Sequence, residues 1–125
     1  MGNDYESSRP IYLQLVDKMS FRMIRGDLKP GDKLPSVRDM AVDSGVNPNT
    51  IQRVYAELER MDIAEVKRGQ GTFVTQDEEK LLQLREELKQ RQIQSFMKEM
   101  NDMGFTLDEI INGIKLEFDN EKGRD

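Results

Sequence analysis

The junction around Gly45 narrows the possible folds of this chain more than any other feature of its sequence. Gly45 suits the left-handed backbone position that follows a helix, and Ser36 is a good N-cap for that helix. Asn47 can cap another helix almost at once, with Pro48 in the first helical position, where its missing N–H costs nothing. Two short helices joined by a tight turn that contains glycine are typical of a helix-turn-helix, so the sequence predicts this motif.

The segments on either side of the motif extend this prediction. Apolar residues recur at helical spacing between Pro10 and Gly26, which indicates one helix before the motif. After the motif the pattern changes, and residues 63–66 and 72–74 are predicted to form short strands around a Gly-rich basic turn at 67–71. Three helices followed by a β-hairpin form the winged variant of the motif.

From Asp77 onward the sequence favours helices. An apolar stripe continues to about residue 103, Gly104 ends it, and Thr106 and Glu109 form a capping box that begins a last helix. The expected fold is mainly α with a small β-hairpin wing, a winged helix-turn-helix followed by a two-helix C-terminal dimerisation extension. The predicted boundaries are a flexible N-terminus over residues 1–8, a winged helix-turn-helix domain over 9–75, a helical dimerisation region over 77–118 and a disordered tail over 119–125.

The chain lacks both cysteine and histidine. Disulfides and thiolate metal sites are therefore excluded, and the commonest general base and metal ligand are missing. The sequence contains no nucleophile–base pairing, no P-loop and no metal-ligand cluster, so we expect no enzymatic activity, no metal and no cofactor. No apolar run is long enough to span a bilayer and no secretory signal opens the chain, so the cytoplasm is the expected compartment.

Charge is distributed unevenly along the chain. The net charge of −5 by itself argues against nucleic acid as a partner. Residues 1–76 hold 11 basic and 11 acidic residues and are neutral, whereas residues 77–125 hold 8 and 13 and carry the whole deficit. Because phosphate repels an acidic segment, any DNA-binding surface must lie in the first half of the chain.

The third predicted helix presents polar residues near its N-terminus, the part that helix-turn-helix proteins place against DNA. Its apolar stripe leaves Asn49, Thr50, Gln52 and Arg53 facing outward, where their donors and acceptors could meet base edges and phosphates. The alternative is a polar face that is merely solvated.

Two further features have both a functional and a structural explanation. Arg38 could contact a phosphate or a base, or could form a surface ion pair with Asp39 or Asp43. The turn at residues 69–71 has the small residues that close approach to a DNA groove requires, but an ordinary hairpin turn would have them too. The residues predicted to bind DNA are Ser36, Arg38, Asn47, Pro48, Asn49, Thr50, Gln52, Arg53, Gly69, Gln70 and Gly71.

Apolar side chains repeat along both predicted C-terminal helices. Met-rich apolar faces adapt well to partners, and two helices alone bury little area on each other, so we favour a second copy of the chain as the partner. Packing within the chain and binding of a small apolar effector are the alternatives. The predicted dimer-interface residues are Leu81, Leu84, Leu88, Phe96, Met100, Met103, Leu107, Ile110, Ile111 and Ile114.

Four segments, in order and at matching spacing over about residues 9–75, resemble the GntR family of bacterial regulators. They are 10–15 (PIYLQL), 26–38 (GDLKPGDKLPSVR), 47–59 (NPNTIQRVYAELE) and 68–74 (RGQGTFV). The short extension after them resembles the YtrA-type branch, which has the smallest C-terminal part.

The resemblance implies a homodimeric regulator, most often a repressor, that binds a palindromic operator in double-stranded DNA. It implies that Arg38 contacts DNA, that residues 47–50, 52 and 53 enter the major groove, and that Gln70 and Gly71 reach the minor groove. YtrA-type members often repress operons that include transporter genes. Neither the residues nor the resemblance indicates a particular small-molecule effector.

Two positions depart from the family pattern. Asp62 stands where the family commonly has glycine, and Asp tolerates the left-handed conformation better than most residues. Pro48 stands where other branches have an arginine that contacts bases, which shifts more of the base recognition to Asn49, Gln52 and Arg53.

Two other classes of function are alternatives to DNA binding. A protein-interaction module built on a winged helix, without DNA, is slightly favoured by the acidic charge, but the outward polar residues of the third helix favour DNA. Some relatives carry an additional aminotransferase-like domain that binds pyridoxal phosphate, and this chain of 125 residues is far too short to contain one.

Overall fold

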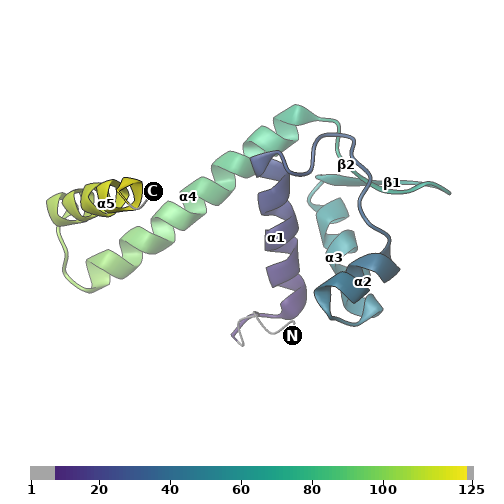
Figure 1. Ribbon diagram of the computed structural model, residues 1–125, viewed down its shortest axis with the longest axis horizontal. Helices are drawn as coiled ribbons and strands as arrows, with labels where there is room; N and C mark the ends of the chain where they lie inside the picture. The colour runs from purple at the N-terminus through teal and green to yellow at the C-terminus, as the bar shows by residue number, and fades with distance from the viewer. Residues whose placement is uncertain (1–7, 124–125) are drawn as a thin grey trace. The chain divides into compact units, whose positions relative to one another are not determined.

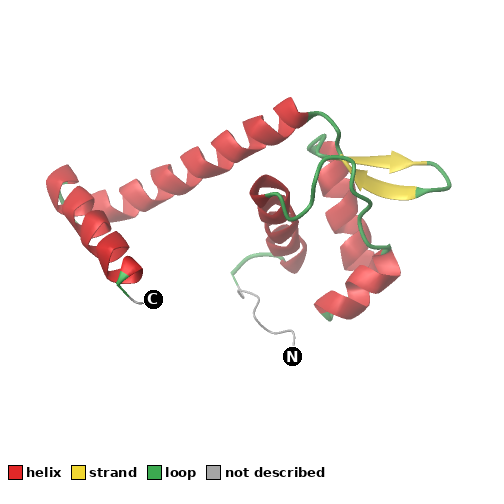
Figure 2. Cartoon of the chain, turned by 45° about the horizontal axis from the view of Figure 1, so that its top comes forward, coloured by secondary structure: helices red, strands yellow, loops and turns green. Residues whose placement is uncertain are grey.

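The computed structural model describes residues 8–123. Within that range the predicted fold class is confirmed, with three helices and an antiparallel hairpin followed by two further helices (Figures 1 and 2). Residues 1–7 of the predicted flexible N-terminus and residues 124–125 of the predicted tail lie outside the described residues. In chain order the elements are α1 (Ile11–Arg25), α2 (Val37–Ser44), α3 (Pro48–Arg60), β1 (Ala64–Lys67), β2 (Gly71–Val74), α4 (Glu78–Asp102) and α5 (Leu107–Lys122).

The caps expected at the helix-turn-helix are present. The Ser36 Oγ accepts a hydrogen bond from the backbone N–H of Asp39 at 3.1 Å, and the Asn47 Oδ1 accepts one from the N–H of Asn49 at 2.8 Å. Gly45 has a φ of 68°, the left-handed value that allows the chain to leave α2 and enter α3 after a turn of three residues. Local hydrogen bonds and one glycine thus fix where α2 ends and α3 begins.

Helix α3 is the central element of the N-terminal part of the chain. Its side chains Ile51, Val54 and Leu58 have no exposed surface. The helix contacts α1, α2 and β1, and Figure 1 shows α1 beside α3 and α2 beside the end at which α3 begins. Full burial of one such side chain contributes about 1.5–3 kcal/mol, so this face of α3 is a main source of stability.

Tyr55 ties α3 to the segment that enters α2. Its buried side chain places the hydroxyl 2.6 Å from the backbone carbonyl oxygen of Pro35, to which it donates a hydrogen bond. Burial disfavours the phenolate and raises the pKa of Tyr55 to about 12, and the positive charge of Arg22 opposes part of this shift. The hydroxyl is therefore a permanent donor at neutral pH.

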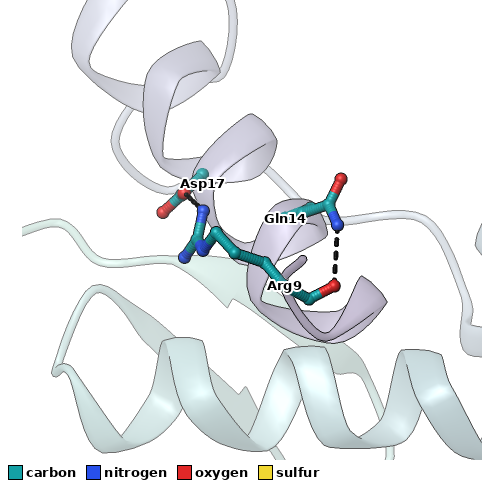
Figure 3. Close-up of polar contacts among 3 residues, drawn as sticks. All are labelled: Arg9, Gln14 and Asp17. Atoms are coloured by element: carbon teal, nitrogen blue, oxygen red, sulfur yellow. Dashed lines mark hydrogen bonds and ion pairs between the residues drawn. The ribbon is translucent and has the colours of Figure 1, made fainter. Parts of the chain in front are cut away.

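Helix α1 begins without a side-chain cap, and other polar contacts hold its first turns (Figure 3). The amide nitrogen of buried Gln14 donates to the backbone carbonyl of Arg9 at 2.9 Å. The guanidinium of Arg9 forms an ion pair of 2.6 Å with Asp17. Together these contacts tie Arg9, two residues before the helix, to the first two turns of α1.

A third extended segment accompanies the hairpin. Strands β1 and β2 pair with each other, and residues 31–34 run along the other edge of β2. The N–H of Leu34 donates to the carbonyl of Thr72, and the N–H of Val74 donates to the carbonyl of Asp32, both at 2.8 Å. The sequence predicted the hairpin but not this pairing, because the paired residues lie far apart along the chain.

The turn between α3 and β1 contains Asp62 in the left-handed conformation, as expected. Its φ is 63°, and it is the only residue other than glycine between 8 and 123 with a positive φ. Asp adopts this conformation with less strain than most side chains, so the turn keeps the shape that glycine would give it.

The chain divides into two compact units at Arg85, and the first is longer than the predicted domain. Leu81 and Leu84, on the first turns of α4, are buried, with 8% and 6% of their surfaces exposed. Arg85 donates a hydrogen bond of 2.9 Å to the backbone carbonyl of Ile24 at the end of α1. The apolar pattern assigned these turns to the dimerisation region because periodicity reveals an apolar face but not what covers it.

The second unit comprises the rest of α4 and α5. The predicted capping box of Thr106 and Glu109 begins α5. The helix continues to Lys122, four residues into the segment 119–125 that was predicted to be a disordered tail. These four residues extend the helix without adding to its apolar face, which is why the sequence pattern ended at Phe118. Ile110 is the only buried residue between 86 and 123.

Removal of the Tyr55 hydroxyl is predicted to destabilise the fold. Tyr55→Phe keeps the ring but deprives the Pro35 carbonyl of its donor, which should lower the free energy of unfolding by about 1–2 kcal/mol. Tyr12→Phe is the matched control, since the Tyr12 hydroxyl has no hydrogen bond among the residues described. Urea denaturation followed by circular dichroism measures both variants, and equal stabilities would contradict the prediction.

The raised pKa of Tyr55 predicts a loss of stability at alkaline pH. The unfolded chain releases the tyrosine proton near pH 10, whereas the folded chain holds it to about pH 12, so the folded state binds more protons in this window and becomes less stable as pH rises. The loss should be on the order of 2 kcal/mol between these limits. Denaturation at a series of pH values should show a smaller loss in Tyr55→Phe, and identical slopes would disprove this assignment.

Candidate nucleic-acid interface

The N-terminal half of α3 divides cleanly into a buried and an exposed face. Asn49, Gln52 and Arg53 are exposed and Thr50 is half-buried, whereas Ile51 is fully buried. The buried face fixes the rotation of the helix about its axis. The predicted polar residues therefore project from a rigid element, as a recognition helix requires.

Three of the residues predicted to bind DNA also define the start of a helix. The side-chain oxygens of Ser36 and Asn47 already accept backbone hydrogen bonds as caps, and Pro48 has no N–H to donate. The Ser36 hydroxyl and the Asn47 amide nitrogen can still donate to a phosphate. For these three residues the structure assigns a local role that is independent of any ligand.

Arg38 lies on the first turn of α2 and is exposed. No ion pair joins it to Asp39, Asp43 or any other residue between 8 and 123. The surface ion pair that was the structural alternative for Arg38 is thus not formed. Its guanidinium keeps five N–H donors and a full positive charge for an external anion.

The tip of the wing combines flexible backbone with positive charge. Gly69 has a φ of 77° as the third residue of a turn in which the N–H of Gln70 donates to the carbonyl of Lys67 at 2.8 Å. Gln70 and Arg68 are exposed at this turn. A type II turn requires a positive φ at this position, so the turn explains the glycine at position 69 without any contact to a DNA groove.

A basic residue that the sequence analysis missed lies beside the wing. A Cβ on Gly71, whose φ is 122°, would come 3.0 Å from the Cε of Lys33. Lys33 reaches this place because the segment that contains it pairs with β2. No local pattern marks that pairing, so no signal in the sequence could have placed Lys33 beside Gly71.

Arg53 has a partner that the sequence analysis also missed. Its guanidinium carbon lies over the ring of Tyr12 on α1, 3.9 Å from the ring centroid. The carboxylate of Glu57, one turn further along α3, is instead paired with Arg60. That hydrogen bond from Arg60 holds the pKa of Glu57 below its ordinary value, and the positive charges of Arg60 and Arg53 add to the effect.

The described part of the chain offers neither a metal site nor a membrane-spanning helix. Within residues 8–123, no three acidic side chains are placed so that they could hold a metal ion. None of the helices in that range is both long and apolar enough to cross a membrane. The exposed side chains of α2, α3 and the wing offer hydrogen-bond donors and the cations Arg38, Arg53 and Arg68, beside the exposed carboxylates of Asp39, Asp43 and Glu59.

The ten predicted dimer-interface residues differ in exposure. Leu81, Leu84 and Ile110 are buried within the single chain, and Leu88 and Met100 are half-buried. The other five are exposed: Phe96, Met103, Leu107, Ile111 and Ile114. The prediction omitted the exposed apolar residues Ile93, Leu116 and Phe118.

Known proteins are similar to this chain in sequence and in fold. The family described as "Bacterial regulatory proteins, gntR family" matches residues 11–74. The HTH-type transcriptional regulator YhcF of Bacillus subtilis (strain 168) is 49% identical over 115 residues, which cover 92% of this chain and 95% of YhcF. The HTH-type transcriptional repressor YtrA of the same organism is 44% identical over 93 residues, 70% of this chain and 72% of YtrA.

Among solved structures, a GntR family transcriptional regulator from Listeria monocytogenes superposes with a TM-score of 0.85 at 38% identity, covering 89% of this chain and 97% of its own. The winged helix-turn-helix, the two C-terminal helices and these similarities lead to one conclusion: the chain belongs to the GntR family of bacterial regulatory proteins and is a transcriptional regulator with that family's DNA-binding domain.

Proposed function

We propose that this regulator is a repressor that binds a palindromic operator as a homodimer. The observation that carries the proposal is the set of exposed donors around the start of α3, in which Arg38, Gln52 and Arg53 form no ion pair or hydrogen bond with an acidic side chain between residues 8 and 123. In the proposed complex the start of α3 lies in the major groove, where an α-helix fits and each base pair presents a distinct pattern of donors and acceptors.

The wing makes the second contact with DNA in the proposed complex. Gln70 and Gly71 approach the minor groove, while Lys33 and Arg68 lie close enough in the fold to contact phosphates on either side. Contacts to phosphate position a protein on DNA, and contacts to base edges give sequence preference. The proposal therefore assigns specificity mainly to Asn49 and Gln52 and affinity mainly to the cations.

Dimer formation is supported by how little of the second unit is covered. Apart from Ile110 no side chain between 86 and 123 is buried, while Ile111, Ile114 and Phe118 expose 40–57% of their surfaces. These three residues recur at spacings of three and four on α5 and so share one face. A two-fold dimer through such a face would present two recognition helices and match a palindromic operator.

The remaining parts of the proposal rest on relatives. A repressor role is supported by the similarity to YtrA, which is named a transcriptional repressor. Control of an operon that includes transporter genes rests only on the resemblance to the YtrA-type branch. An operator-binding protein of a bacterium acts in the cytoplasm, which is the compartment we propose.

Arg53→Ala and Arg38→Ala should each weaken operator binding by about 1–3 kcal/mol, because each removes a cation from the proposed interface. Arg60→Ala is the matched control, since Arg60 lies on the same helix but is paired with Glu57. The measurement is fluorescence anisotropy with the duplex that the wild-type chain enriches from a random pool, at two salt concentrations. Affinity should fall steeply with salt, because phosphate contacts release counterions. Failure to enrich any duplex, or a flat salt response, would contradict the proposed function.

Charge placed on the exposed face of α5 should separate the dimer. We predict that Ile111→Glu combined with Ile114→Glu gives a monomer by size-exclusion chromatography with light scattering, since burying two carboxylates in an apolar interface is prohibitive. Asn112→Glu adds charge to the same helix outside that face and should remain dimeric. The monomer should also lose most operator affinity, because it can occupy only one half-site at a time. A double variant that stays dimeric would place the interface elsewhere.

A further inference from the structure

We propose that Tyr12 is a positioning residue for DNA binding, which holds the guanidinium of Arg53 in place at the start of α3. This inference rests on the proposed function, because it assigns a role within the same DNA-binding surface. Tyr12 belongs to α1, an element that no sequence feature connects with the recognition helix. The contact between the two residues therefore brings a third helix into the proposed interface.

The geometry of the contact is that of a stacked cation and ring. The guanidinium carbon of Arg53 lies 3.9 Å from the centroid of the Tyr12 ring, well within the range of about 6 Å over which a cation is attracted to an aromatic face. The two residues stand on helices that pack directly against each other. Contacts among Arg9, Gln14 and Asp17 fix the first turns of α1 (Figure 3), and Tyr12 is the second residue of this helix.

Stacking on the ring would hold the Arg53 guanidinium in position while leaving its N–H donors available to an anion. The five N–H donors of a guanidinium lie in its plane, so a ring on its face leaves those donors available at its edges. A carboxylate partner would have occupied them, but Glu57 is paired with Arg60. The long arginine side chain also loses conformational freedom before DNA arrives, which reduces the entropy that binding itself must overcome.

The apolar stripe of α1 does not by itself explain a tyrosine at position 12. Leu15, Val16 and Met19 are buried, with at most 4% of their surfaces exposed, whereas Tyr12 is only half-buried. The Tyr12 hydroxyl has no hydrogen-bond partner among residues 8–123. The ring and not the hydroxyl is therefore the part of Tyr12 that the contact uses.

A double-mutant cycle on operator affinity tests this role. The probe is the duplex that the wild-type chain enriches from a random pool, and affinity is measured by fluorescence anisotropy for the full-length chain. Tyr12→Leu, which removes the ring but keeps apolar volume, should weaken binding about fivefold. In the Arg53→Ala background the same substitution should change affinity less than about twofold. Tyr12→Phe, which keeps the ring, should bind the duplex as tightly as the wild-type chain.

Controls separate positioning from a general effect on the fold. Phe21→Leu is the matched control, because Phe21 lies on the same helix, exposes 44% of its surface and has no cation over its ring among the described residues. It should leave affinity unchanged. If Tyr12→Leu does not fold, Arg53→Lys tests the same contact from the other side: an ammonium keeps the positive charge but lacks the planar face that stacks, so its affinity should lie between those of the wild type and Arg53→Ala.

The outcomes distinguish the two proposals. Equal effects of Tyr12→Leu with and without Arg53 would overturn the positioning role while leaving the operator-binding function intact. Loss of affinity in Tyr12→Phe would also overturn it, because the hydroxyl would then contact DNA directly. Failure of the wild-type chain to enrich any duplex would overturn the proposed function itself, and with it this inference, before any variant is compared.

Discussion

The burial of one face of α3 is the constraint on which the rest of the structure depends. Ile51, Val54 and Leu58 are fully buried on a helix that contacts α1, α2 and β1, so α3 can neither rotate nor shift without opening the core. The opposite face is thereby held at one fixed orientation to solvent. Because one helix provides both the core and the exposed polar face, stability of the first unit and recognition by its surface are consequences of the same packing.

Features fixed by local chemistry could be predicted from the sequence. The caps at Ser36, Asn47 and Thr106 and the left-handed turn at Gly45 each depend on residues within four positions of one another, and all four are present as expected. The same holds for the hairpin. These elements follow from hydrogen bonds and backbone sterics that require no knowledge of the rest of the chain.

Features that depend on contacts between distant segments could not be predicted in this way. Lys33 reaches the wing, Arg53 reaches Tyr12, and Leu81 and Leu84 are covered by the first unit, and none of these arrangements leaves a periodic signal. Periodicity correctly marked Leu81 and Leu84 as apolar-face residues but assigned that face to a partner subunit. For the candidate site, the sequence identified which side chains face outward, whereas the structure supplied their neighbours.

The pairing of residues 31–34 with β2 has a consequence for cooperativity. The backbone bond from Leu34 to Thr72 joins the two ends of the segment that contains the whole helix-turn-helix, so that segment forms a closed loop. Opening the base of the wing would release both ends of the loop at once and expose the helices within it. Backbone amides of α2 and α3 should therefore exchange with solvent through the same opening event as those of β2, as one cooperative unit. A ligand that binds only the wing would then slow hydrogen exchange in α2 and α3, which it does not contact.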